Sequence, residues 1–308
     1  MDSIEHGYTC ILNVDKNIDG IEGEHLPGKT DEHVRRIESH DQALVNIPPA
    51  ICNIFINIEE IDLNRCLIEK IDNDSFKGCK KLKSLKLERN QISQIDENAF
   101  IQNPDLEYIE LWSNQLTTLP ENVFISQQKL QYLAIDSNRI VSLPSNVFKP
   151  LKSLKTINLS SNRISALNPE WFETLYGLEN LYLHFNQIEE LPEGIFTHLS
   201  QLTQFSMYSN RLRVIHSNSF GYHPNLQFAW LQMNQIEAID ERFILNTSVS
   251  EISMNLNVCA HGTIVDTTRS RTRMRMALRF CFENFENLEA DSLKQLLIDR
   301  IQSPRINV

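Results

Sequence analysis

The sequence lacks the signals that would place it among enzymes or membrane-spanning proteins. It has no run of about 18 apolar residues, so no membrane-spanning helix is predicted. Its 9 glycines form no phosphate-binding loop, and no nucleophile elbow or His-Glu-x-x-His motif occurs. The 9 histidines have no metal-site spacing with a cysteine or carboxylate. We therefore expect no enzymatic activity, no bound metal and no cofactor.

Positive charge is also scarce. The chain has 29 Lys and Arg against 40 Asp and Glu, for a net charge of −11. Nucleic-acid-binding surfaces need a basic footprint, so we expect no nucleic-acid partner. One basic cluster stands out near the C-terminus and consists of Arg269, Arg271, Arg273, Arg275 and Arg279. It could hold an anionic partner such as a sulfated glycan or a membrane surface, or it could be a solvated face of a terminal cap.

One pattern returns every 24 residues between Leu82 and Phe243. Its units begin at Leu82, Leu106, Leu130, Leu154, Leu178, Leu202 and Leu226. The template is LxxLxLxxNxLxxLxxxxFxxLxx, with Ile, Val or Phe allowed at the Leu positions. The LxxLxL segment alternates apolar and polar residues, as a strand with one buried face does. A single coil cannot bury its own apolar edges, so neighbouring coils must stack and the ends must be capped.

Two further columns of the template explain how each coil closes. Asparagine occupies positions Asn90, Asn114, Asn138, Asn162, Asn186, Asn210, Asn234 and Asn257. Its amide can donate to and accept from the backbone that turns away from the strand, whose peptide groups would otherwise stay unpaired. Phenylalanine recurs from Phe76 to Phe220 and fills the far side of each coil. We predict an α/β repeat fold, a curved solenoid with a parallel concave sheet and a phenylalanine spine on the convex side.

The template resembles the leucine-rich repeat (LRR) family of extracellular type, over nearly the whole chain. Tyr8–Cys10, Gly23–His25 and Ile47–Pro48 are similar to N-terminal segments of secreted insect LRR proteins. This points to Toll ectodomains and mosquito leucine-rich immune proteins. The resemblance implies secretion, although no signal-peptide pattern follows Met1, so we expect the chain to start inside the mature protein. Receptor signalling is not implied, because the sequence has no membrane span or signalling domain.

The sequence divides into three parts. Residues 1–57 are an N-terminal cap with a degenerate first coil, 58–257 a solenoid of about nine units, and 258–308 a C-terminal cap. In the N-terminal cap we expect a hairpin around the run YTCILNV. In the C-terminal cap, Met274 to Phe285 have helical apolar spacing, and Leu293 to Ile301 predict a separate short amphipathic helix. This C-terminal helix is a candidate surface for oligomerisation.

The cysteines and the glycosylation sequons indicate in which cellular compartment the protein is found. The LRR resemblance implies a disulfide between Cys259 and Cys281, which would close the C-terminal cap. The pairing of Cys10, Cys52, Cys66 and Cys79 stays open, since the last three can be buried thiols or contribute one disulfide. Three glycosylation sequons, at Asn73, Asn158 and Asn246, agree with export. A sugar on Asn158 would lie on the concave sheet.

Large aromatic residues at solvent-facing strand positions are the main indication of function. They are Tyr108, Trp112, Tyr132, Tyr182, His184, Tyr208, Phe228 and Trp230, with the one histidine included. Tyrosine and tryptophan are enriched at binding hot spots, although aromatic residues also suit strands and stack on each other. We predict a protein or glycan ligand on the concave face, with a role in innate immunity. The alternatives are a structural or adhesive extracellular protein and an intracellular scaffold, because fold does not decide function.

Overall fold

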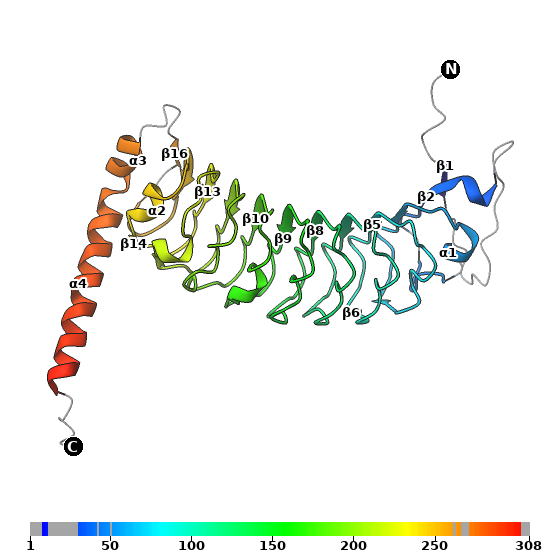
Figure 1. Ribbon diagram of the computed structural model, residues 1–308, viewed down its shortest axis with the longest axis horizontal. Coiled ribbons are helices and arrows are strands. Elements are labelled where there is room, and N and C mark those ends of the chain that lie inside the picture. Colours follow the sequence, from blue (N-terminus) through cyan, green and yellow to red (C-terminus); the bar gives the residue numbers. More distant parts are fainter. Residues whose placement is uncertain are drawn as a thin grey trace.

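The protein forms an elongated, gently curved stack of coils (Figure 1). The computed structural model describes residues 8–11, 30–41, 43–49, 51–260, 263–265 and 271–302. Each coil contributes one short strand to a sheet that runs the length of the stack, and the rest of the coil returns with little regular structure. The predicted solenoid with its parallel sheet is confirmed.

The main sheet has twelve strands within the described residues. In spatial order they are β1 (Tyr8–Ile11), β2 (Val34–Glu38), β3 (Glu60–Asp62), β5 (Ser84–Lys86), β7 (Tyr108–Glu110), β8 (Tyr132–Ala134), β9 (Thr156–Asn158), β10 (Asn180–Tyr182), β11 (Gln204–Ser206), β13 (Phe228–Trp230), β15 (Glu251–Ser253) and β16 (Thr263–Val265). Every pairing from β1 to β15 is parallel, and between β3 and β13 partner residues are 24 positions apart, as in Tyr108 opposite Tyr132.

The alternating pattern of the template decides which side chains enter the core. Within β7, Ile109 is fully buried while Tyr108 and Glu110 on either side are half-exposed on the concave face. The Leu columns and the phenylalanine spine from Phe76 to Phe243 are buried throughout. Each such side chain contributes ~1.5–3 kcal/mol by leaving water. Stability therefore depends on stacked coils, which bury one another's edges.

The asparagine column forms a continuous hydrogen-bonded ladder. Asn162 Nδ2 donates to the carbonyl oxygens of Ile135 (3.0 Å) and Leu159 (3.1 Å), and its Oδ1 accepts from the amide of Ile140 (2.9 Å). All eight asparagines make equivalent bonds to their own coil and the preceding one. The residue before each asparagine has a positive φ, such as 53° at Ser161. The amide thus satisfies the peptide groups that the sharp turn exposes.

Two small parallel sheets lie on the return side of the coils, and proline explains their limits. They pair β4 (Lys70–Ile71) with β6 (Gln94–Ile95) and β12 (Val214–Ile215) with β14 (Ala238–Ile239). In each pair, the residue that follows the second strand donates its backbone amide to the first strand, as Asp96 does to the carbonyl oxygen of Ile71. The coils between them carry Pro120, Pro144, Pro169 and Pro192 at or beside this position. Proline has no N–H, so the ladder cannot continue there.

The N-terminal end differs from the sequence prediction. The strand β1 pairs parallel with β2 and extends the main sheet, so the expected hairpin is wrong. The 3-10 helix η1 (Asp31–His33) precedes β2, and the helix α1 (Ile51–Ile54) replaces the phenylalanine segment of the first coil. A disulfide joins Cys52 on α1 to Cys79 of the next coil, which resolves that pairing. Cys66 is buried, with its sulfur 3.5 Å from the carbonyl oxygen of Ser39.

The C-terminal end closes the last coil with a strand and helices. The strand β16 pairs antiparallel with β15, and the predicted disulfide joins Cys259 to Cys281. The helices are α2 (Arg242–Leu245), α3 (Arg271–Ala277) and α4 (Arg279–Gln302), and 3-10 helices η2 (Pro169–Trp171) and η3 (Ser217–Ser219) occur earlier. The separate short helix expected from Leu293 is wrong, because α4 continues through this region. Residues 286–292 contain no proline or glycine that would end it.

The helix α4 packs along the end of the solenoid and then extends past it (Figure 1). Phe285 meets the ring of His216 edge to face at 5.2 Å, and Asn284 Nδ2 donates to the carbonyl oxygen of Glu237 (2.8 Å). Over the residues that the structure describes, no helix is both long and apolar enough to cross a bilayer.

Candidate functional site

Because the strands pair in the same register from coil to coil, the predicted aromatic residues lie on one face of the main sheet. Tyr108, Tyr132, Tyr182, Phe228 and Trp230 lie on strands of the main sheet. Trp112, His184 and Tyr208 lie two residues beyond strand ends, just before the sharp turn. All eight are half-buried. The structure divides them into two groups rather than one continuous surface, because the coil between them has the small polar residues Thr156, Asn158 and Ser160 at the equivalent positions.

The first group is centred on two stacked tyrosines. The rings of Tyr108 and Tyr132 are 4.3 Å apart and nearly parallel. The hydroxyl of Tyr108 donates to Glu110 Oε1 at 2.8 Å, and burial together with this carboxylate raises the pKa of Tyr108. Burial also raises the pKa of Tyr132. Both phenols therefore remain protonated donors at physiological pH.

The second group is a platform around His184 and Tyr208. Their rings stack with centroids 4.3 Å apart, and Phe185 meets Tyr208 edge to face at 5.0 Å. Burial lowers the pKa of His184 to about 4, so its imidazole is neutral at physiological pH. Tyr182 lies edge to face with His184 at 6.2 Å, and its hydroxyl donates to Gln204 at 3.1 Å. Phe228 and Trp230 extend the aromatic surface toward the C-terminal end, with their rings 5.8 Å apart.

Phe185 is a functional candidate that the sequence prediction missed. It occupies the positive-φ position before Asn186, where four other coils have serine, and half of its surface is exposed. The equivalent positions of the other coils have Asp, Arg, Ser, Met or Leu and no other aromatic residue. A single phenylalanine in this column was the signal that could have revealed it.

The N-terminal third of the concave sheet is charged instead of aromatic, and its charges are paired with one another. Arg36 contacts Glu60 at 3.1 Å and Asp62 at 3.0 Å, while Lys86 Nζ lies 2.6 Å from Glu60 Oε1. These pairs neutralise most of the charge that the sequence placed there. A hollow of about 400 Å³ follows, at the edge of the sheet between His40 and Trp112.

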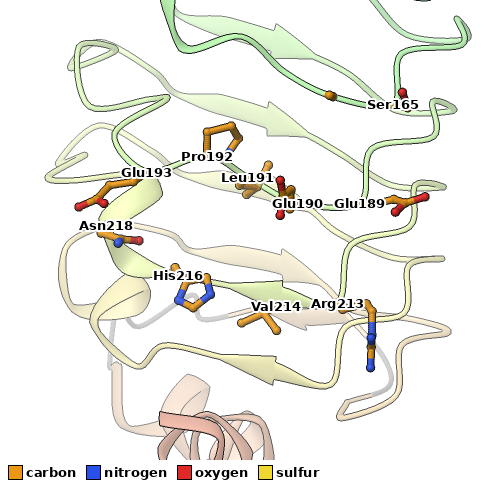
Figure 2. Close-up of a pocket in the computed structure, with 11 residues that line it drawn as sticks. Ser165, Glu189, Glu190, Leu191, Pro192, Glu193, Arg213, Val214, His216 and Asn218 are labelled. Atoms are coloured by element: carbon orange, nitrogen blue, oxygen red, sulfur yellow. The ribbon is translucent and has the colours of Figure 1, made fainter. Parts of the chain in front are cut away.

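A larger hollow of about 890 Å³ lies away from the concave sheet, on the return segments of the coils (Figure 2). Figure 2 shows Leu191, Pro192 and Val214 near its middle. Glutamates lie along its border, and Arg213 there is paired with Glu237 at 2.6 Å. None of the predicted site residues lines it. It marks the alternative face on which a ligand could bind.

The basic cluster is largely neutralised where its side chains are described. Arg275 Nε donates to Glu241 Oε1, and Arg279 Nε donates to Glu283 Oε1 at 2.7 Å. Arg269 and the side chains of Arg271 and Arg273 lie outside the described part. These contacts favour a solvated face of the cap over an anion-binding surface.

The three sequon asparagines differ in their surroundings. Asn73 is exposed, and Asn246 is half-buried. Asn158 is half-buried on β9, where its Nδ2 donates to Asp136 at 2.9 Å and its Oδ1 accepts from the hydroxyl of Ser160 at 2.7 Å. The nitrogen that would carry a sugar is therefore already bonded within the concave sheet.

Three segments of the chain match the family model described as leucine rich repeat. They span residues 56–116, 128–188 and 176–236, which together are more than half of the chain. A search of curated proteins finds no match.

Solved structures with a similar fold include two Toll-type receptor complexes. The Toll–Spatzle complex, from Drosophila, has a TM-score of 0.64 and 18% identity, covering 74% of this chain and 36% of the matched one. The TLR13–ssRNA13 complex has a TM-score of 0.64 and 20% identity, covering 75% and 37%. This chain thus spans well under half of those two chains. An RNA complex in the comparison means that the exclusion of nucleic acid, made from net charge, receives no support from the fold.

A third similar structure is an octameric complex of Latrophilin 3, Unc5D and FLRT2, whose FLRT2 part is its LRR component. It has a TM-score of 0.62 and 22% identity, covering 75% of this chain and 71% of the matched one. At these identities the likeness shows the fold alone.

Proposed function

Because the chain belongs to the leucine-rich repeat family, we propose that it is a secreted, non-enzymatic recognition protein that binds a partner protein on its concave sheet. The platform formed by His184, Tyr208 and Phe185 is the observation that carries this proposal. It presents stacked, uncharged aromatic surface on the outside of an acidic molecule. Such rigid aromatic groups provide contact area at a small entropic cost, which is typical of hot spots.

The similar structures support this type of function. Toll is seen in complex with Spatzle, and FLRT2 is part of an assembly with Latrophilin 3 and Unc5D. We propose a role in innate immunity as well, for which the Toll–Spatzle complex, described as a hub in development and innate immunity, gives support. Disulfides at both ends of the solenoid favour an oxidising, extracellular location. An adhesive extracellular protein is the main alternative, and an intracellular scaffold fits the paired cysteines least well.

Site-specific photo-crosslinking tests the proposed face. A benzophenone side chain placed at Tyr208 or Phe185 should yield a discrete crosslinked product with a protein from the native extracellular fluid. The matched controls are Tyr176 and Tyr222, two exposed tyrosines outside the strands of the main sheet. Crosslinks of equal yield from the control positions, or from them alone, would place the partner elsewhere.

We also propose that the chain self-associates through its C-terminal helices. The side chains of Leu293 to Ile301, where the sequence analysis placed this surface, lie outside the described part, so the proposal rests on α3 and the start of α4. Met276 and Phe280 lie on α3 and at the start of α4, and they are 74% and 60% exposed. Burying such side chains against a second copy would remove apolar area from water. Light scattering should show a concentration-dependent dimer that Phe280→Ser abolishes. A monomer at all concentrations would contradict this proposal.

A further inference from the structure

The hollow of about 400 Å³ at the N-terminal end of the concave sheet is built from four successive coils. Asn64, Glu88 and Trp112 occupy the same template position in adjacent coils, with His40 and Asp41 closing the end. Arg65 and Arg89 form the rim at the positive-φ positions. The volume lies within the range of small-molecule sites, about 300–1,000 Å³. It therefore suits a compact ligand or a terminal group of a larger one.

Glu88 provides an acceptor that the protein leaves unused. Its Oε2 is shielded from solvent and has no hydrogen-bond partner among the described residues. Burial raises the pKa of this carboxyl group, and the nearby carboxylates of Glu110 and Asp62 raise it further. Buried polar atoms are almost always bonded, so this oxygen is open to a donor from water or from a ligand that enters the hollow.

Arg65 and Arg89 provide the opposite chemistry. Both are exposed, and neither forms an ion pair within the described part of the chain, whereas Arg36 and Lys86 nearby are each bonded to carboxylates. The guanidinium of Arg89 lies 4.9 Å from the centre of the Trp112 ring, which holds it in place. Successive coils are roughly 5 Å apart, so both guanidiniums can reach a single anionic group.

We infer that this hollow binds an acidic saccharide. A carboxylate or sulfate of the sugar lies between Arg65 and Arg89, a hydroxyl donates to Glu88 Oε2, and Trp112 holds the Arg89 guanidinium in place. A simple anion would leave Glu88 without a donor. A neutral sugar would leave the two guanidiniums unused, and a basic side chain would be repelled by them. The inference goes beyond the proposed function, because it places a ligand of a different class at the N-terminal end of the concave sheet, apart from the platform.

A matched pair of probes tests the ligand class. The first is a β-linked disaccharide that ends in glucuronate, and the second is the same disaccharide with its carboxyl group reduced to an alcohol. Titration calorimetry should show that the wild-type protein binds the acid about tenfold more tightly, the order expected from one charge-assisted contact. The double variant Arg65→Gln/Arg89→Gln should bind both probes equally weakly. Glu88→Leu should weaken both probes by a similar factor, because both keep their hydroxyl groups.

The control variant is Arg139→Gln, an exposed arginine outside the hollow, which should change nothing. Equal affinity of the wild-type protein for both probes, or equal effects of Arg139→Gln and the rim variant, would overturn the inference. Tyr182→Ala and Trp230→Ala separate it from the proposed protein-binding function. If they abolish the protein crosslink while saccharide binding persists, the two sites are distinct; if the rim variant alone loses the saccharide, the hollow is its site. Loss of saccharide binding in Tyr182→Ala would refute this assignment.

Discussion

The imidazole of His184 lies flat against the phenol ring of Tyr208, with centroids 4.3 Å apart and an interplanar angle of 10°. Its Nδ1 also lies 3.0 Å from the hydroxyl of Ser206 on the adjacent strand β11. The ring is therefore fixed by two neighbours and withdrawn from water. Because the same burial lowers the pKa of His184 to about 4, the platform is aromatic and uncharged at neutral pH.

The buried imidazole should make stability depend on pH. In the unfolded chain His184 gains a proton near its ordinary pKa of 6.5, but in the folded protein it does so only near 4. Between these values the unfolded state binds more protons, so stability is fully present above pH 6.5 and falls as the pH drops toward 4. We expect His184→Gln to reduce the difference in melting temperature between pH 7 and pH 4.5.

Calorimetry at the two pH values measures this effect. His223 supplies the internal control, because burial lowers its pKa too and its contribution stays in the variant. A variant whose melting temperature depends on pH as steeply as the wild type would show that His184 does not titrate in this window.

Single aromatic substitutions should separate the two concave groups. Tyr208→Ala and Trp230→Ala each remove a half-buried ring from the second group and should weaken partner binding by ~1–3 kcal/mol. Trp112→Ala removes a ring from the first group. It should weaken partner binding only if the surface that the partner covers extends across the coil of Thr156. Surface plasmon resonance on the crosslinked partner checks these values. Uniform loss across all three variants would indicate one continuous footprint, and no loss in any would exclude the concave face.

The ladder predicts a high cost for losing one asparagine. Asn162→Leu would remove the acceptor of the Ile140 amide and the donor to the carbonyl oxygens of Ile135 and Leu159. Each orphaned buried group costs ~1–3 kcal/mol, so chemical denaturation should show a clear loss of stability. The control is Asn146→Leu, since Asn146 is exposed and its side-chain amide donates to Glu121 on the surface. Equal stability of the two variants would disprove the structural role of the ladder.

Periodicity made the solenoid predictable from the sequence. Each template position has one physical role, repeated in every coil, so Ile109 or Asn162 could be placed without coordinates. The errors fall where the repeat ends. β1 joins the sheet in parallel instead of folding as a hairpin, and α4 continues past Phe285, because tertiary contacts at the caps are not repeated along the chain.

The candidate site was predictable only in part. The strand positions placed the eight aromatic residues on the concave side, as the structure has them. Their separation into two groups depends on the coil of Thr156, which no aromatic pattern marks. The assignment of the hollow around Glu88 as a ligand site depends on one shielded carboxylate oxygen and on two arginines without ion pairs in the described part of the chain. Such contacts arise from side-chain conformations in four coils and leave no trace in sequence spacing.

Removing either disulfide should destabilise the end that it closes. The bonds span 27 residues for Cys52–Cys79 and 22 for Cys259–Cys281. Loops of this length correspond to ~2–4 kcal/mol of stabilisation. We expect Cys259→Ser/Cys281→Ser to increase hydrogen exchange in β15 and α3 before the central coils are affected, because stability in a repeat protein is local. Exchange that rises evenly along the chain would contradict this.

Glycan mapping on protein from its native source is the last test, and the structure distinguishes two of the three sequons. Asn73 is exposed in a turn and can present its amide nitrogen to an attached sugar. Asn158 Nδ2 instead donates to Asp136, whose carboxyl pKa is already raised by burial. A sugar there would replace one of the two amide hydrogens, crowd this bond within the sheet, and separate the two aromatic groups.

We therefore expect mass spectrometry to find occupancy at Asn73 and none at Asn158. Asn158→Gln is the matched variant, and it should leave the mass of the glycoprotein unchanged apart from the substitution. A fully occupied Asn158 would cover the middle of the concave sheet. The partner would then have to bind at one end of the sheet or on the return side, beside Leu191 and Val214.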